Sequence, residues 1–415
     1  SREKKEPKKS FKPLPPLFFI PRFMLGDETM CFPIGDVFMS KKYSIFITAL
    51  FCLFTFGFGI AHFLLPDREF SEQENTYLEQ FTPPTWDTVR SGEFMERFEK
   101  YYNHQFPLRD QWVQLKAYSE RALGKQENNK VYFDRIEGGQ TLFAHFTKIS
   151  DEDLATRVGF VNKLGDNLDV PVYFSLVPDK SWVWADDLPD YAPNVDDGST
   201  IERAMGLCGE NVTYIDLRGA LDYDSFYRTD HHWTTMGAMQ AYFSLIWTIA
   251  GESSGDWYHE PELQSDQFYG TTYSASGAGW VRPDSIYTII PEGGTRGNIT
   301  VTRYPEGQPI EGGLYYPEKL EVKDKYAYFL GGNQPLCIIR NPDAQGGKLL
   351  VIRDSYSDSL APFLAEEFQE VHLFDLRYNN VSLKKYAADH EIDQVLVLYS
   401  TANFSTDQNL FKLGM

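Results

Sequence analysis

The sequence predicts an α/β protein, a mostly parallel sheet flanked by helices, preceded by one N-terminal transmembrane helix. Two observations predict this fold. From about residue 131 onward, short apolar runs typical of strands alternate with helical segments, which is the pattern of a parallel sheet covered on both faces. Ahead of them, residues 43–65 form an uncharged apolar stretch. A hydrophobic content of 42% and an aromatic content of 15% favour folded protein over disorder.

Residues 43–65 are long enough to span a membrane. At 1.5 Å per residue, about 23 residues make a helix of roughly 34 Å, against a hydrocarbon core of about 30 Å. Lys41 and Lys42 precede the stretch, whereas Asp67 and Glu69 follow it. This asymmetry predicts a single-pass anchor in the cell membrane with a cytoplasmic N-terminus and an extracytoplasmic domain. A cleaved signal peptide is the alternative, but the run is longer than a usual signal and lacks a clear small-x-small cleavage site.

Residues 1–42 are basic and proline-rich at their start, which predicts a disordered cytoplasmic tail. Met39, directly before Ser-Lys-Lys, resembles a natural start. These residues hold 9 Lys/Arg and 5 Asp/Glu, whereas residues 66–415 hold 30 and 54. An acidic surface repels phosphate backbones, so we expect no nucleic-acid partner, although solubility alone also explains the charge.

The remaining chain divides into a helical segment, residues 66–130, and an α/β domain, residues 131–415. In the first, aromatic residues at spacings of three and four (Phe94, Phe98, Tyr101, Tyr102) indicate one face of a helix. In the second, the predicted strands are 172–176, 212–217, 348–356 (running into a turn), 371–376 and 392–400. Residues 255–325, rich in Gly, Pro and Tyr, are expected to be a loop-rich insertion.

Two motifs in the α/β domain can carry chemistry. Asp230 and His232 are two residues apart, which in extended backbone places both side chains on one face. A carboxylate that orients an imidazole is what a general base needs. Ser355 follows the apolar strand 348–353 at a turn that opens a helix, where α/β sheets place reactive groups. The amides of Ser355 and Tyr356 are candidate donors to an oxyanion there.

Each motif also has a simpler interpretation. The Asp230–His232 run can be a metal site, although His231 and His232 would point apart in a strand and no second ligand cluster is evident. Ser355 can be a helix N-cap and Trp233 can be core. We therefore expect no metal. Cys208 and Cys337 lie in the exported part, where a disulfide between them is one option, and no Cys/His spacing indicates zinc.

The string Asp230-His231-His232-Trp233 resembles the signature of the DHHW family of exported bacterial proteins. Its surroundings are similar to the SGNH-hydrolase-like alginate O-acetyltransferases, in which an Asp-x-His-Trp motif precedes a Gly-x-Ser nucleophile turn. Further matching strings are residues 68–75, 91–112 and 177–189. The resemblance implies an SGNH-hydrolase-like fold and a triad of Ser355, His232 and Asp230. Here Arg353 replaces the glycine expected two residues before the serine.

The resemblance also implies the parts around the triad. Residues 331–335, Gly-Gly-Asn-Gln-Pro, resemble the block that lends oxyanion donors in SGNH enzymes, which makes Gly332 and Asn333 candidates beside Tyr356. Trp233, Tyr273 and Trp280 are candidates for stacking on sugars, with ordinary packing as the alternative, and Arg353 is a further substrate-binding candidate.

The expected function is therefore an extracytoplasmic O-acetyltransferase or acetylesterase acting on a cell-surface or exported polysaccharide, without a cofactor. The relatives imply a multi-spanning membrane O-acyltransferase partner as acetyl donor, since acetyl-CoA is not supplied outside the cell. The alternative is a non-catalytic carbohydrate-binding or scaffold subunit of a polysaccharide modification or export complex.

Overall fold

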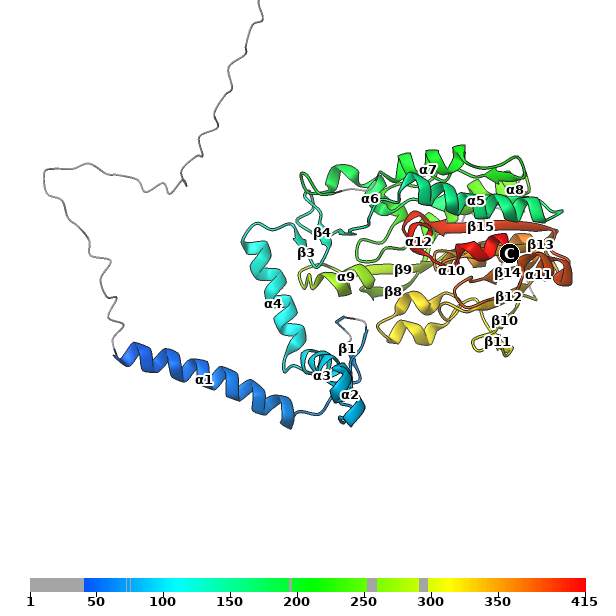
Figure 1. The fold of residues 1–415 in the computed structure, drawn as a ribbon. Coiled ribbons are helices and arrows are strands. Elements are labelled where there is room, and N and C mark those ends of the chain that lie inside the picture. Colours follow the sequence, from blue (N-terminus) through cyan, green and yellow to red (C-terminus); the bar gives the residue numbers. More distant parts are fainter. Residues whose placement is uncertain (1–40, 72, 75, 194–195, 252–259, 291–297) are drawn as a thin grey trace, which may run out of the picture. The chain divides into compact units, whose positions relative to one another are not determined.

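The computed structural model describes residues 41–415 apart from 72, 75, 194–195, 252–259 and 291–297 (Figure 1). All but two residues of the predicted tail 1–42 therefore lie outside the described residues. The chain divides into two compact units, Ser1–Ile60 and Ala61–Met415.

The apolar stretch forms one continuous helix, α1 (Lys41–Leu64), in agreement with the predicted span. Its mean hydropathy reaches 2.1, and length and composition suffice for crossing a membrane. None of the residues in its most apolar part is buried by the described chain. A helix in the core of a soluble protein would be mostly covered, so its exposed apolar surface needs an apolar environment.

The second unit opens with short elements before the main sheet. They are β1 (Phe70–Ser71), β2 (Thr76–Tyr77), α2 (Trp86–Ser91), α3 (Glu93–His104), α4 (Arg109–Ala122) and an antiparallel sheet of β3 (Glu127–Asn128), β4 (Val131–Phe133) and β5 (Leu142–Ala144). The predicted aromatic face is present on α3, where the rings of Phe94 and Phe98 stack with centroids 5.8 Å apart. Residues 66–130 thus contain helices, as their spacing predicts.

The main sheet has eight strands in the order β11-β10-β12-β14-β13-β15-β6-β7 (Figure 1). Their bounds are β6 (Val172–Val177), β7 (Val212–Tyr214), β10 (Thr300–Arg303), β11 (Ile310–Gly312), β12 (Leu336–Arg340), β13 (Gly346–Arg353), β14 (Phe368–Phe374) and β15 (Gln394–Ser400). Neighbouring strands from β14 to β7 are parallel, and β12, β10 and β11 continue the sheet antiparallel. The sheet is therefore mostly parallel, as predicted.

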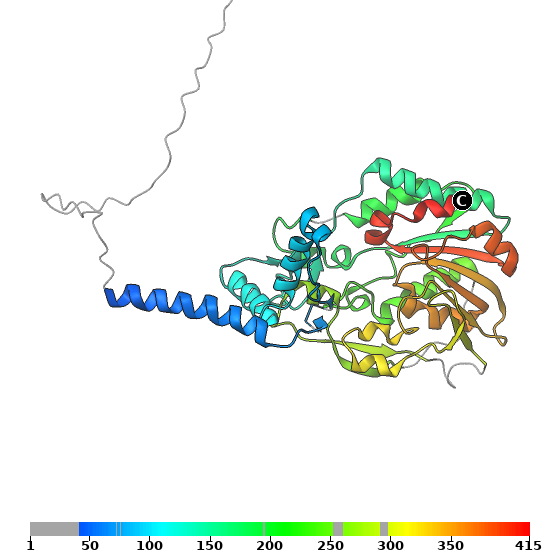
Figure 2. The ribbon, with the colours of Figure 1, turned by 60° about the horizontal axis from the view of Figure 1, so that its bottom comes forward.

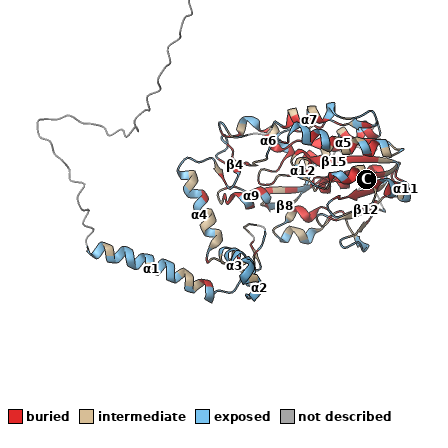
Figure 3. Cartoon of the chain, viewed as in Figure 1, coloured by how far each residue is buried: buried red, intermediate tan, exposed pale blue. Residues whose placement is uncertain are grey.

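Helices cover both faces of this sheet, because its central strands are apolar on both sides. In β13, Leu349 and Val351 face one core and Leu350 and Ile352 the other. The first core is closed by α8 (Thr235–Ile249) and α10 (Ser357–Glu367), the second by α5 (Asp151–Asn167), α7 (Asp197–Gly206) and α11 (Leu383–His390). Figure 2 shows helices on either side of the strands, and Figure 3 shows the strands as the buried layer.

The remaining short helices lie at chain connections. They are α6 (Lys180–Val183), η1 (Ala185–Asp187), η2 (Tyr223–Ser225), α9 (Thr271–Ser276), η3 (Pro317–Glu321), η4 (Lys325–Tyr328), α12 (Thr401–Thr406) and η5 (Leu410–Gly414).

The described parts of residues 255–325 are more regular than the predicted loop-rich insertion. They contain the antiparallel pair β8 (Glu262–Phe268) and β9 (Asp284–Thr288), and β10 and β11 extend the main sheet. β10 and β11 are short, and all four strands carry few apolar residues. In β10, Val301 is the residue that enters the core. Such a pattern gives no clear period-two signal in the sequence.

Cys208 and Cys337 are free thiols. Cys337, in β12, packs in the core on one face of the sheet, whereas Cys208 packs against the core on the other. The sheet separates them, so the disulfide that the sequence left open does not form in this fold.

Candidate active site

The loop 226–233 brings Asp230 and His232 together. An antiparallel bridge between Phe226 and Trp233 closes this loop. Asp230 and His232 lie in a bend, not in the extended backbone that we expected. Their side chains still meet, because the His232 amide donates to Asp230 Oδ1 at 3.0 Å in a turn that aspartate commonly forms. The predicted pairing of Asp230 with His232 is present, but a turn produces it and not an extended backbone.

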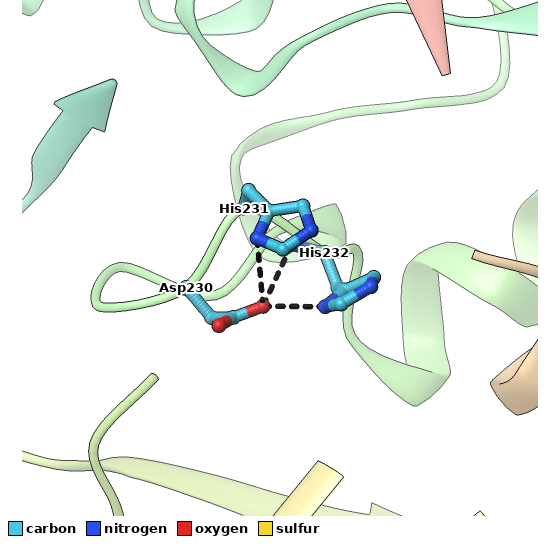
Figure 4. A group of neighbouring side chains, drawn as sticks. All are labelled: Asp230, His231 and His232. Carbon is cyan, nitrogen blue, oxygen red and sulfur yellow. Dashed lines mark hydrogen bonds and ion pairs between the residues drawn. The ribbon is translucent and has the colours of Figure 1, made fainter. Parts of the chain in front are cut away.

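His232 links Asp230 to Ser355. The His232 Nδ1 lies 2.6 Å from Asp230 Oδ1 (Figure 4). Its Nε2 lies 2.6 Å from Ser355 Oγ. The ionised Asp230 carboxylate can only accept hydrogen bonds, and it also accepts from the His232 amide. His232 Nδ1 must therefore carry the proton. Nε2 is then the acceptor for the Ser355 hydroxyl. The structure brings together the three residues that the two motifs nominate.

Asp230 is held ionised and immobile. Its Oδ2 accepts from the amide and the hydroxyl of Thr271 at 2.7 and 2.9 Å. Burial opposes ionisation, but the imidazoles of His231 and His232 and the hydrogen bonds from His232 hold the pKa of Asp230 well below its usual range. Gly270 packs directly over this carboxylate: a Cβ there would lie 2.2 Å from Asp230 Cβ.

Ser355 stands in a turn between β13 and α10. Asp354 shapes this turn: its carboxylate accepts from the Tyr356 amide at 3.0 Å and from the amide and hydroxyl of Ser400, both at 2.8 Å. Helix α10 begins at Ser357 without a side-chain cap, so Ser355 is not an N-cap. Its hydroxyl is directed to His232 instead.

Two oxyanion candidates from the sequence are already occupied. The Tyr356 amide donates to Asp354, and the Gly332 amide donates to the Phe329 carbonyl at 3.2 Å. The Ser355 amide, in contrast, has no hydrogen-bond partner among the residues described. Among the backbone amides expected from the sequence, the Ser355 amide therefore remains the candidate.

Arg353 is a supporting residue and not an exposed substrate contact. Its side chain is fully buried, with the guanidinium 2.7 Å from Asp358. The same guanidinium donates to Asn333 Oδ1 at 2.8 Å. Because arginine only donates, the Asn333 amide must turn its oxygen inward and leave Nδ2 as a donor on the exposed side. The residue that replaces the expected glycine thus orients a predicted oxyanion donor.

His231 and His232 lie side by side, contrary to the expectation that they point apart. Their ring centroids are 3.9 Å apart, because the backbone bends between them. Ligand-type atoms of Asp230, His231 and His232 fall within 4.8 Å of one another. However, both Asp230 oxygens accept two hydrogen bonds, and His232 Nδ1 carries a proton. This arrangement suits a proton relay and does not fit a metal ion, which would need those lone pairs.

Two residues that support the relay, Lys180 and Tyr326, were not predicted from the sequence. The buried Lys180 ammonium donates to the carbonyls of Tyr227, Arg228 and Asp230, at 3.0, 3.0 and 2.6 Å, and thereby clamps the loop 226–233. The Tyr326 ring stacks on the His232 imidazole at a centroid distance of 3.9 Å. A lysine inside a short apolar segment was a weak available signal for the first, whereas nothing in the sequence distinguishes Tyr326 from 24 other tyrosines.

Of the three aromatic candidates for sugar stacking, Trp233 and Tyr273 are buried and Trp280 is partly buried. Trp233 is fully buried and donates from its indole to the Tyr356 carbonyl and Ser359 hydroxyl, both at 2.9 Å. Tyr273 is 8% exposed and packs on Tyr269. Trp280 packs on Phe133 beneath an arginine side chain. The packing alternative therefore describes their contacts.

Comparison with known proteins agrees with this geometry. The sequence matches the family described as "DHHW protein" over residues 198–374, a range that contains all three residues of the relay. A search of curated proteins finds no match. Among solved structures, a DHHW family protein from Eubacterium siraeum superimposes with a TM-score of 0.59 and 21% identity, covering 69% of this chain and 95% of that one.

A second similar structure is that of Bacillus cereus PatB1 with a sulfonyl adduct, with a TM-score of 0.57 and 22% identity over 69% of this chain and 98% of that one. At such identities the likeness concerns the fold. It agrees with the mostly parallel sheet flanked by helices that was expected from the sequence. Residues 198–374 of this chain thus match the DHHW protein family, and both solved structures share its fold of a mostly parallel sheet flanked by helices.

Proposed function

We propose that this protein is a serine-dependent O-acetyltransferase or acetylesterase that acts outside the cytoplasm on a cell-surface or exported polysaccharide. One observation carries the proposal: the Ser355 hydroxyl, the His232 imidazole and the Asp230 carboxylate form a continuous relay with two links of 2.6 Å. A serine attacks an ester only when a neighbouring base removes its proton, and this relay supplies that base.

The chemistry follows from the positions of the protons. Ser355 Oγ attacks the acetyl carbonyl of the donor while His232 Nε2 takes the hydroxyl proton, and Asp230 stabilises the imidazolium. The Ser355 amide and Asn333 Nδ2 are the donors proposed for the oxyanion. The tetrahedral intermediate collapses when the leaving group takes the proton from His232, which leaves an acetyl-serine. A sugar hydroxyl or water, deprotonated by His232, then receives the acetyl group.

The cellular setting is part of the proposal. Helix α1 would anchor the chain by a single pass, with the N-terminus in the cytoplasm and the α/β domain outside. An acetyl donor would then have to be supplied at the outer surface, which is the role proposed for a multi-spanning O-acyltransferase partner. The domain itself needs no cofactor for the steps above.

The test compares the full chain in detergent with its Ser355→Ala variant. Hydrolysis of a chromogenic acetyl ester is expected to fall by about 10³-fold or more, because the attacking oxygen is lost. Ser119→Ala, which removes an exposed helical hydroxyl, is the matched control and should leave the rate unchanged. Since PatB1 is described with a sulfonyl adduct, a sulfonyl fluoride supplies a second readout: mass spectrometry should find the label on Ser355.

Equal hydrolysis by the parent and the Ser355→Ala chain would disprove the assignment of the nucleophile. A parent chain without esterase activity and without sulfonyl labelling, but with glycan binding, would support the scaffold alternative.

A further inference from the structure

A cavity separate from the relay lies at the same edge of the main sheet. Its volume is about 390 Å³, within the roughly 300–1,000 Å³ typical of small-molecule sites. It is lined by Glu137, Thr141, Trp184, Asp187, Tyr223, Asp224, Phe226, Tyr227, Arg228, Thr234, Pro283, Asp284, Ser285 and Tyr287. Trp184 follows β6 and Tyr223 follows β7, both parallel to β13, which ends before Ser355. The cavity and Ser355 thus share the carboxyl edge, where α/β sheets bind ligands.

The loop 226–233 connects this cavity to the relay. Phe226 and Arg228 line the cavity from the start of the loop, whereas Asp230 and His232 lie farther along it. Thr234, just after the loop, lines the cavity as well and donates to the Asp224 carbonyl at 2.8 Å. The loop 226–233 therefore contributes residues to both the cavity and the relay, as expected for neighbouring parts of one extended binding site.

The cavity has an aromatic platform. The Tyr223 ring stacks on the Trp184 indole, with centroids 5.6 Å apart and planes at 23°. Trp184 is 6% exposed, whereas Tyr223 is 51% exposed. The buried indole thus fixes a tyrosine ring whose other face is open to a ligand. Pyranose rings present C–H groups that stack on such a face, so the platform suits a sugar.

The cavity is also acidic, because Glu137, Asp187, Asp224 and Asp284 line it against one arginine, Arg228. None of the ion pairs among the described residues involves the carboxylates of Glu137, Asp187 or Asp224. The nearby arginines are used elsewhere: Arg228 pairs with Asp284, itself buried, and Arg135 pairs with Asp190. Burial, and then the carboxylates of Asp134, Glu137 and Asp186, raise the pKa of Asp187, and Arg135 opposes this rise.

We propose that this cavity is a subsite for an amino sugar with a free ammonium group. The sugar ring stacks on Tyr223, and Glu137, Asp187 and Asp224 accept from the ammonium. That this sugar is part of the glycan that Ser355 modifies rests on the proposed function. Polyuronates and N-acetylated sugars are disfavoured, since the former are repelled by the carboxylates and the latter carry no charge.

Binding is measured by calorimetry with the full Ser355→Ala chain in detergent, which prevents turnover. The probe is a tetramer of β-1,4-linked glucosamine, and its N-acetylated counterpart is the comparison. The glucosamine tetramer should bind, and the N-acetylated tetramer should bind at least about fivefold more weakly, the equivalent of one surface ion pair. Tyr223→Ala should weaken glucosamine binding about fivefold to tenfold through lost stacking.

The role of the cavity carboxylates and the role of the aromatic platform are each tested with a control substitution elsewhere. Glu137→Gln combined with Asp224→Asn should weaken binding at least about fivefold. Glu306→Gln and Tyr378→Ala, on exposed residues outside the cavity lining, should leave it unchanged. No binding of the glucosamine tetramer, equal binding of the acetylated one, or no effect of Tyr223→Ala would each overturn the proposal. Glucosamine binding with these effects in a protein whose parent hydrolyses no acetyl ester would leave the subsite standing and remove only the proposed reaction.

Discussion

At the scale of single residues, the Asp230 carboxylate determines the geometry of the relay. One oxygen accepts from the backbone and the ring of His232, and the other accepts from the backbone and hydroxyl of Thr271. With all four bonds in place, neither the carboxylate nor the imidazole can rotate without losing charge-assisted hydrogen bonds. Burial lowers the pKa of His231 to about 3, so the neighbouring ring stays neutral and does not compete for the carboxylate as a cation.

Gly270→Ala should abolish most of the activity without unfolding the protein. The added Cβ would lie 2.2 Å from Asp230 Cβ and 2.3 Å from its Oδ2, too close for either to remain in place. Displacing a catalytic group by about 1 Å can cost on the order of 10²-fold in rate, so we expect at least that loss in kcat. Gly206→Ala, with no atom within 4 Å of its Cβ, is the control. An unchanged kcat in a folded Gly270→Ala chain would contradict the role given to Asp230.

The sequence indicates the three residues of the relay better than the residues that position them. Asp230, His232 and Ser355 stand out because unusual side chains occupy short local motifs. The positioning residues are Gly270, Tyr326 and Lys180. They lie 29 to 94 positions in the chain from the relay residues that they contact, and only the fold brings them together. The extended backbone assumed at Asp230 was wrong because an aspartate followed by polar residues favours a turn.

At the scale of elements, the parallel strands place the residues of the site at one edge of the main sheet. The strand ends of β13 and β15 meet through Asp354, whose Oδ2 accepts from Ser400 and, at 2.8 Å, from the side-chain Nδ2 of Asn403 in α12. The long apolar strands β6, β13 and β15 were predicted because they are buried on both faces. The short strands β10 and β11 were not, because their pairing with β12 depends on neighbours distant in sequence.

Asp197 makes a second junction between elements, and it should make stability depend on pH. It lies at the start of α7, and its Oδ2 accepts from the Asp179 amide after β6 and from the Thr401 hydroxyl of α12, both at 2.6 Å. Burial, and then the nearby Asp179, raise the pKa of Asp197 to about 7. The folded protein therefore binds a proton more tightly than the unfolded chain. This contribution is full below about pH 4 and is lost as pH rises through about 7.

Asp197→Asn tests this sign, because an amide reproduces the protonated acid. Thermal unfolding between pH 4 and 8 should show the midpoint of the variant falling less with rising pH than that of the parent. At pH 8 the variant should be the more stable of the two. Asp169→Asn, at an exposed turn, is the control with no effect on the slope. Parallel pH profiles for Asp197→Asn and the parent would show that the carboxyl is not protonated in the folded state.

At the scale of the whole molecule, the chain joins an apolar helix to an acidic α/β domain. The 24 residues of α1 span about 36 Å at 1.5 Å per residue, which exceeds a hydrocarbon core of about 30 Å. Lys41 and Lys42 stand at one end, and Asp67 and Glu69 follow the other. Because cytoplasmic ends of spans are enriched in lysine and arginine, the acidic domain is expected on the outer side. A reaction on exported polysaccharide requires this orientation.

Protease added to spheroplasts of an expressing bacterial host tests the orientation directly. Residues 66–415 should be digested while the spheroplasts are intact, and a marker fused to the N-terminus should be protected until the membrane is opened with detergent. A cytoplasmic enzyme of the host, measured in the same samples, reports whether the membrane stayed closed. Protection of the α/β domain in intact spheroplasts, with digestion only after detergent, would place the relay in the cytoplasm. In that case Ser355 could not act on an exported polysaccharide, even if it hydrolysed acetyl esters in detergent.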